Sequence, residues 1–183
     1  MVMRSSLNMV FMLVILVGWN GFASSVSAEQ VSYRETQWEE LIPSSWDLGK
    51  LFEGFDLDNL SDDDPRAKAL LEKIKDEWKK APSNRELQNQ KIKIAGFIAP
   101  LDWEKDNELK EFLLVPFFGA CIHTPPPPAN QIIHVRPDKP LKGVQSMDTI
   151  WVYGTIMLEI NDSGAMGTSG YTMKADRIKR FEQ

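Results

Sequence analysis

The stretch that decides the fold is Lys91-Ile92-Lys93-Ile94-Ala95-Gly96-Phe97-Ile98-Ala99-Pro100-Leu101. Its isoleucines alternate with lysines, and a period of two is typical of a β-strand that buries one face. Gly96 interrupts the alternation and predicts a bend, because glycine inside a strand often marks a bulge or a sharp turn of the backbone. The stretch therefore predicts a long, bent strand at the start of a β domain.

Four more segments after this strand have the composition of strands. A polar turn over residues 102–108 leads to a largely buried strand over 112–118. Shorter and longer strands follow at 132–136 and 150–160, and residues 171–181 suit an edge strand with basic residues on one face. Five bent strands indicate a mainly β (α+β) fold, which we interpret as a small OB-like five-stranded barrel, because a sandwich usually has more strands.

Residues 29–90 are expected to form an N-terminal helical arm. Asp64 is a good N-cap and Pro65 a good first helical residue, and apolar residues at helical spacing follow, so an amphipathic helix is predicted over residues 65–80. Trp38 and Leu41 are among the large apolar side chains expected to anchor the segment before it. With the barrel at 91–183, residues 29–183 are predicted to be one domain.

The first 28 residues have the pattern of a secretory signal peptide. Arg4 precedes an apolar run over residues 9–17, and Val26-Ser27-Ala28 supplies small residues for cleavage. The run is shorter than the roughly 20 residues of a membrane-spanning helix. We therefore expect a periplasmic protein that is not integral to the membrane, and not a lipoprotein because no cysteine follows the cleavage site.

Charge and cysteine content exclude some functions. The chain has a formal net charge of −5, which argues against nucleic acid as a partner because nucleic-acid binding depends largely on Lys and Arg at phosphates. The single cysteine, Cys121, cannot form an internal disulfide. In an oxidising compartment it is therefore buried, metal-bound, reactive or paired between chains.

Cys121, His123 and His134 are the candidate metal ligands. In an extended chain Cys121 and His123 project from the same face, and His134 in the next strand would meet them across a hairpin. Thiolate and imidazole suit zinc or copper, and we take zinc as the expected cofactor. The alternative is that Cys121 is a buried apolar residue and the histidines are structural. A thiol enzyme that uses Cys121 is a third interpretation, for which the sequence offers no further signature.

The four prolines Pro125, Pro126, Pro127 and Pro128 follow directly after this pair of residues. Proline fixes φ and removes the backbone donor, so the segment is predicted to be a stiff extended rod. It is either a rigid connector or a docking surface, with Asn130 and Gln131 as adjacent amides for a partner. The connector interpretation is favoured because linkers of this composition are common.

The sequence also resembles the DUF3299 family of exported bacterial proteins of unknown function. The resemblance is carried by residues 93–101, by Glu111 to Gln131 with its Val-Pro-Phe-Phe-Gly-Ala-Cys-Ile-His-Thr-Pro-Pro-Pro-Pro core, and by Trp151-Val152-Tyr153-Gly154. It implies a periplasmic location and an association with ABC-type transport or metal uptake, and it includes Cys121 and His123 but not His134. It implies no settled reaction.

These observations together predict a non-enzymatic periplasmic accessory or binding protein. In the leading hypothesis it binds zinc and works with components of an ABC-type transporter. The main alternative is a protein–protein interaction module without a metal, and an enzyme that uses Cys121 remains the third hypothesis.

Overall fold

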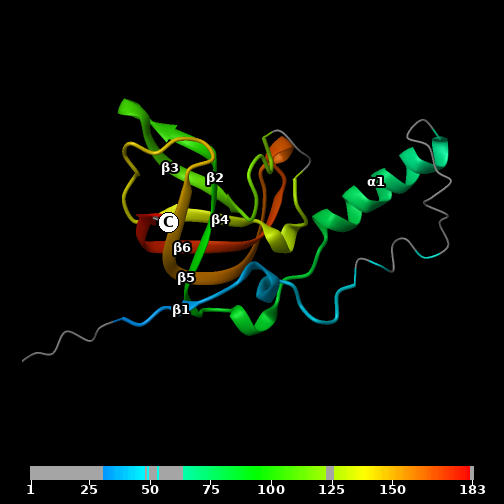
Figure 1. Ribbon diagram of the computed structural model, residues 1–183, viewed down its shortest axis with the longest axis horizontal. Coiled ribbons are helices and arrows are strands. Elements are labelled where there is room, and N and C mark those ends of the chain that lie inside the picture. The colour runs from blue at the N-terminus through cyan, green and yellow to red at the C-terminus, as the bar shows by residue number, and fades with distance from the viewer. Residues whose placement is uncertain (1–30, 48, 50–52, 54–63, 123–125, 182–183) are drawn as a thin grey trace, which may run out of the picture. The chain divides into compact units, whose positions relative to one another are not determined.

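The computed structural model describes residues 31–47, 49, 53, 64–122 and 126–181. Residues Ser32–Gln183 form one compact unit. Its described part contains one six-stranded sheet and a single α-helix (Figure 1). The prediction of a mainly β protein is therefore confirmed.

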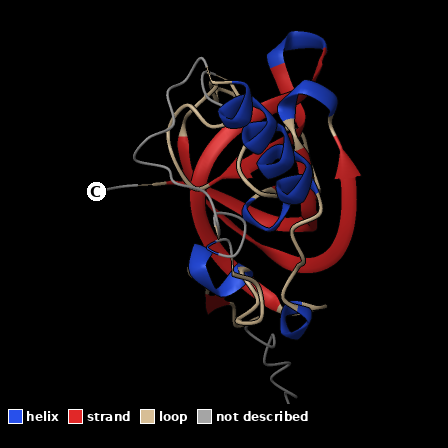
Figure 2. Cartoon of the chain, turned by 90° about the vertical axis from the view of Figure 1, so that its right-hand side faces the viewer, coloured by secondary structure: helices blue, strands red, loops and turns tan. Residues whose placement is uncertain are grey.

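The sheet closes on itself through hydrogen bonds between its strands. Its order is β1-β2-β3-β4-β6-β5, and β2 also pairs with β5. Neighbours are antiparallel except β1–β2 and β4–β6, which are parallel. Figure 2 shows the strong curvature of these strands. Their bounds are β1 Arg34–Glu35, β2 Lys91–Glu104, β3 Glu108–Val115, β4 Ile133–Pro137, β5 Thr149–Asp162 and β6 Thr168–Arg180.

The main hydrophobic core lies on one face of this sheet. Ile92 and Ile94 of β2 are fully buried in it, as their alternation with lysines predicts. Gly96 lets two side chains approach the strand closely, because a Cβ atom there would lie 2.8 Å from Leu114 Cγ and 3.0 Å from Trp38 Cζ2. The glycine that interrupts the sequence pattern is thus a packing site for the arm.

The N-terminal arm is tied to the sheet by hydrogen bonds as well as by apolar contacts. Trp38, in the 3-10 helix η1 (Trp38–Leu41), donates its indole N–H to Ala95 O at 2.7 Å. Leu41 is fully buried, and its carbonyl accepts the Tyr171 hydroxyl at 2.7 Å. The Tyr171 oxygen in turn accepts the Asn84 backbone N–H at 2.5 Å. One buried phenol therefore joins three separate segments of the chain.

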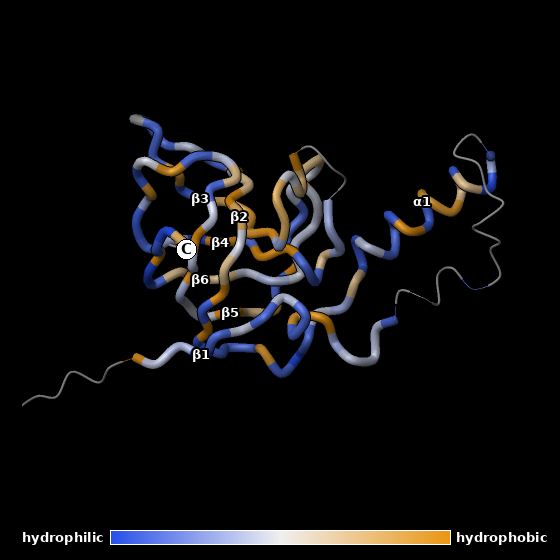
Figure 3. Tube along the Cα trace, viewed as in Figure 1, coloured by the Kyte–Doolittle hydropathy of each residue, from blue (hydrophilic) through white to orange (hydrophobic). Residues whose placement is uncertain are grey.

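The amphipathic helix is confirmed as α1, Pro65–Lys79. The Asp64 side chain caps it by accepting the Arg66 backbone N–H at 2.8 Å, and Pro65 is its first residue. Figure 3 shows hydrophobic and hydrophilic residues alternating along α1. Within the described residues, no helix combines the length and the apolar character that a membrane span requires.

Two strand predictions were wrong. Residues 171–181 were expected at an edge, but β6 pairs with β4 on one side and with β5 on the other. Its first half carries Tyr171, Met173 and Ala175 into the core, so it is a central strand there. The strand expected over 112–118 ends at Val115, and Phe117 and Phe118 are exposed instead of buried.

Candidate functional site

The segment after β3 is a compact turn that presents aromatic side chains to the solvent. Ala120 N–H donates to Phe117 O at 3.4 Å, and Ile122 N–H donates to Gly119 O at 3.2 Å. Gly119 N–H also contacts the Met147 sulfur at 3.1 Å. The side chains of Phe117 and Phe118 are 47% and 67% exposed. We therefore call residues 116–122 the aromatic turn.

A small hydrophobic cluster beneath the turn holds it on the sheet. Cys121 belongs to this cluster with Leu113 of β3 and Ile132, which precedes β4. The Phe97 ring meets the Phe118 ring edge to face, with centroids 6.0 Å apart. Packing on this cluster and on Phe97 thus fixes the position of the Phe118 ring.

Cys121 packs into the base of the aromatic turn. Its side chain is buried, and burial raises the pKa of its thiol to about 11. At pH 7 only about 10⁻⁴ of such thiols are ionised, and the thiolate is the nucleophilic form. Its backbone has φ of +66°, so the chain is not extended at this residue. The strand alternation that would place Cys121 and His123 on one face does not apply here.

His123 and Pro125 lie outside the described residues. Among the residues that are described, no three His, Cys, Asp or Glu side chains are placed to hold a metal ion together. The metal site of Cys121, His123 and His134 therefore stays a prediction, because one of its three members is not included in that set.

His134 lies on β4, on the face of the sheet opposite the main core. It is in register with Leu113 of β3 and Thr172 of β6. Its Nε2 atom is 2.7 Å from Glu111 Oε2, and its Nδ1 atom is buried without a hydrogen-bond partner among the described residues. A carboxylate on one ring nitrogen and a free second nitrogen is the arrangement of many metal-binding histidines.

The described prolines pack against the chain. A Cβ atom at Gly167 would lie 2.6 Å from Pro126 Cβ, and Gly167 has φ of +102°, so the proline segment and the start of β6 fit together only with glycine at this position. Pro127 is buried and Pro128 half-buried. Both the connector and the docking-surface interpretations therefore stay predictions.

The two amides after the prolines make internal hydrogen bonds. Asn130 is fully buried, and its Nδ2 atom donates to Pro82 O at 3.1 Å. Gln131 donates its Nε2 hydrogens to Trp38 O at 2.9 Å and to Asn130 O at 3.1 Å. Both residues lie in the 3-10 helix η6, Ala129–Gln131, and join it to the arm. The Asn130 side chain is not at the surface, where a partner would have to contact it.

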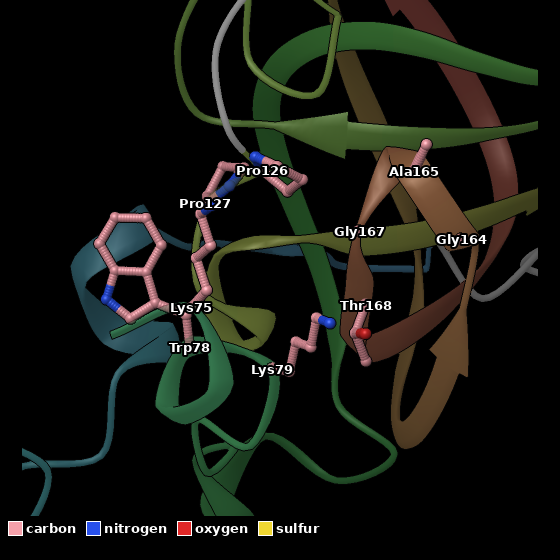
Figure 4. A pocket seen from close by; sticks show the side chains of 9 residues that line it. All are labelled: Lys75, Trp78, Lys79, Pro126, Pro127, Gly164, Ala165, Gly167 and Thr168. Atoms are coloured by element: carbon pink, nitrogen blue, oxygen red, sulfur yellow. The ribbon is translucent and has the colours of Figure 1, made fainter. Parts of the chain in front are cut away.

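A cleft of about 200 Å³ lies between the end of α1 and the proline segment. Figure 4 shows Pro126 and Pro127 on one side and Gly167 and Thr168 on the other. The helix contributes Trp78 and two lysines, and the remaining lining residues come from the 3-10 helix η7, Gly164–Met166. Among the described lining residues, none is a His, Cys, Asp or Glu.

The sequence did not predict the aromatic turn or the cleft. The run Val-Pro-Phe-Phe reads as the end of a buried strand, although Pro116 and Gly119 are turn residues that mark its limit. The cleft depends on contacts between α1 and segments far along the chain, for which no local pattern exists.

Comparison with known proteins identifies the family. A family model described as "Protein of unknown function (DUF3299)" matches residues 38–180. The chain is also similar to a crystal structure of a DUF3299 family protein from Pseudomonas aeruginosa PAO1, with 32% identity and a TM-score of 0.65, over 84% of this chain and 99% of that one. No curated protein matches. The resemblance seen in the central motif is thus confirmed, and the chain belongs to the DUF3299 family.

Proposed function

We propose that this protein is an exported, non-catalytic accessory protein that binds a partner protein through its aromatic turn. The observation that carries the proposal is the exposure of two adjacent phenylalanines, Phe117 and Phe118, at 47% and 67%. Ile122, at the other end of the turn, is 38% exposed. Aromatic side chains that are exposed together commonly mark protein–protein interfaces.

The construction of the turn supports a binding role. Its two backbone hydrogen bonds and the packed Cys121 hold the rings in place before a partner arrives. Little conformational entropy is then lost on binding. Covering the exposed part of each phenylalanine contributes about 1–2 kcal/mol. The two rings together thus reach the scale of an interface hot spot, about 2 kcal/mol or more.

The state of Cys121 supports a role without catalysis. A nucleophilic cysteine needs a lowered pKa and an open approach, whereas burial raises the pKa of this thiol. It is the only cysteine of the chain. The hypothesis of a thiol enzyme is therefore the least supported of the three.

We also propose that the sheet is a closed barrel of the OB type. The pairing of β2, β3, β4, β6 and β5, with β2 paired to both β3 and β5, supports this interpretation. Such a barrel would be a rigid support for the aromatic turn, which follows its second strand.

The location and partner belong to the same proposal. The signal-peptide pattern of residues 1–28 supports export to the periplasm. The resemblance that links this motif to ABC-type transport suggests a transporter component as the partner.

Site-specific photo-crosslinking in cells tests the proposal. We expect p-benzoylphenylalanine in place of Phe118 to give one defined adduct, identified by mass spectrometry as a transport component. The control places the crosslinker at Ile160, which is 76% exposed and lies on β5. A crosslinker in place of Phe117 should give the same adduct. The additional substitution Phe118→Ser should remove that adduct. Equal adducts from positions 118 and 160, or none from 118, would refute the proposal.

A zinc site is the second candidate function, and the geometry of His134 favours it. Glu111 holds one ring nitrogen, while the other is buried and has no partner among the described residues. Zinc at this position, with Cys121 and His123 as further ligands, would satisfy that nitrogen. We expect one zinc per chain, lost in Cys121→Ala, His123→Ala and His134→Ala. Purified protein without zinc, or zinc retained in all three variants, would remove this candidate.

A further inference from the structure

One outer face of the sheet carries five cations in an otherwise acidic protein. Lys93 of β2 pairs in register with Tyr153 of β5, which pairs with Arg177 of β6. The adjacent rows align Lys91 with Thr155 and Lys174, and Ala95 with Trp151 and Lys179. Residues in register project from the same face. We call this surface the basic face, and its cations are Lys91, Lys93, Lys174, Arg177 and Lys179.

Aromatic rings position the cations of the basic face. Lys93 Nζ lies 5.0 Å from the centroid of the Trp151 ring. The Arg177 guanidinium carbon lies 4.1 Å from the Tyr153 centroid and 5.8 Å from the Tyr33 centroid. Phe181 stacks on Trp151, with centroids 5.7 Å apart. These contacts hold the charges over the sheet without neutralising them.

The basic face keeps part of its charge unpaired. Lys93 forms an ion pair with Glu35 at 2.9 Å, and Lys174 lies 3.6 Å from Asp138. Arg177 and Lys179 make no ion pair with any residue that the structure describes. The chain as a whole has a formal net charge of −5. Asp176, next to Arg177, accepts the Tyr33 hydroxyl at 2.9 Å and is a third acid beside these cations. Five cations against three acids still leave a local excess of positive charge on this face.

We propose that the basic face docks on the surface of a bilayer containing anionic phospholipids. Lysine and arginine together with Trp, Tyr and Phe are the residues enriched where proteins meet lipid headgroups. Each cation near an anionic leaflet is attracted to its surface potential, and several cations on one face act together. The basic face consists of side chains on three hydrogen-bonded strands. It is therefore broad enough to contact the extended, negatively charged surface of a bilayer.

This docking does not depend on the aromatic turn, which belongs to a different cluster of residues. An acidic protein is the alternative occupant of the basic face. It would need particular acidic groups opposite Arg177 and Lys179, whereas the bilayer needs only negative charge. Binding measurements with lipid vesicles and with polyglutamate distinguish the two occupants.

The test is co-sedimentation of the protein, in the form that cells accumulate, with lipid vesicles. We expect binding to phosphatidylcholine vesicles that contain about one third phosphatidylglycerol, no binding to pure phosphatidylcholine, and weaker binding as salt rises. The triple variant Lys93→Gln, Arg177→Gln, Lys179→Gln should bind about 100-fold more weakly. Unchanged circular dichroism should show that this variant is folded.

The matched control removes the same charge elsewhere. The triple variant Lys68→Gln, Lys73→Gln, Lys105→Gln changes exposed residues on α1 and in the β2–β3 connection. It should bind the anionic vesicles within about threefold of the unmodified protein, because attraction falls off within a Debye length. The proposal is overturned if anionic vesicles are not bound, if pure phosphatidylcholine is bound equally, or if the control loses as much binding. Binding to polyglutamate but not to vesicles would assign the face to an acidic protein.

Discussion

Replacing Tyr171 with phenylalanine should destabilise the fold by more than a single lost hydrogen bond. The hydroxyl donates to Leu41 O at 2.7 Å and accepts from Asn84 N–H at 2.5 Å. Tyr171 and Leu41 are fully buried. Tyr171→Phe keeps the ring but leaves a buried carbonyl and an amide without a partner. At about 1–3 kcal/mol for each of the two unsatisfied groups, we expect a loss of about 2–6 kcal/mol in the free energy of unfolding.

Equilibrium urea denaturation measures this loss. The midpoint should fall while the m-value stays the same, because the surface exposed on unfolding does not change. The control is Tyr33→Phe, which removes an exposed hydroxyl that donates to Asp176 at 2.9 Å. That variant should stay within about 0.5 kcal/mol of the unmodified protein. A loss in Tyr171→Phe no larger than in the control would refute the role of the phenol in joining the arm to the sheet.

Three further predictions follow from the same structure. Gly167→Ala should lower the free energy of unfolding, measured in urea, by about 2–3 kcal/mol, because its Cβ would lie 2.6 Å from a proline carbon. The control Gly143→Ala, with φ of +67° and no atom within 4 Å, should lower it by about 1 kcal/mol. Equal losses in the two variants would contradict the packing of Gly167 on the proline segment. Cys121 should resist a water-soluble thiol reagent until urea unfolds the chain, and rapid native labelling would disprove its burial. Stability should fall at alkaline pH: the pKa of Cys121 is raised from 9.0 to about 11, so its contribution is complete below pH 9 and lost toward pH 11. Cys121→Ala should flatten this loss in urea titrations at several pH values, and an unchanged slope would contradict it.

Local patterns predicted those elements whose stability is local. The alternation around Ile92 and Ile94 located β2, and Asp64 with Pro65 located the start of α1. The edge prediction for residues 171–181 was wrong because β6 is central through its pairing with β4. That pairing joins strands far apart in the sequence, and no short pattern encodes it.

The candidate site was only partly visible in the sequence for a related reason. The unusual composition around Cys121 marks the segment that contains the proposed site. Cys121, however, has a positive φ in a turn that packs on Leu113 and Ile132, so the extended geometry assumed for it did not hold. The basic face likewise exists only through register, because Lys93 and Arg177 become neighbours when both strands pair with β5.

The pairing of β2 with both β3 and β5 has a consequence for how the protein folds. The contact between Lys91 and Thr155 cannot form until most of the chain is available. Proteins dominated by such distant pairings fold slowly and expose unpaired strands meanwhile. A chain that emerges from a ribosome or a translocation pore would therefore stay open to proteases, and would bind chaperones, until β6 has emerged and paired. Loss of the C-terminal strand should abolish a folded product altogether, not leave a smaller stable domain.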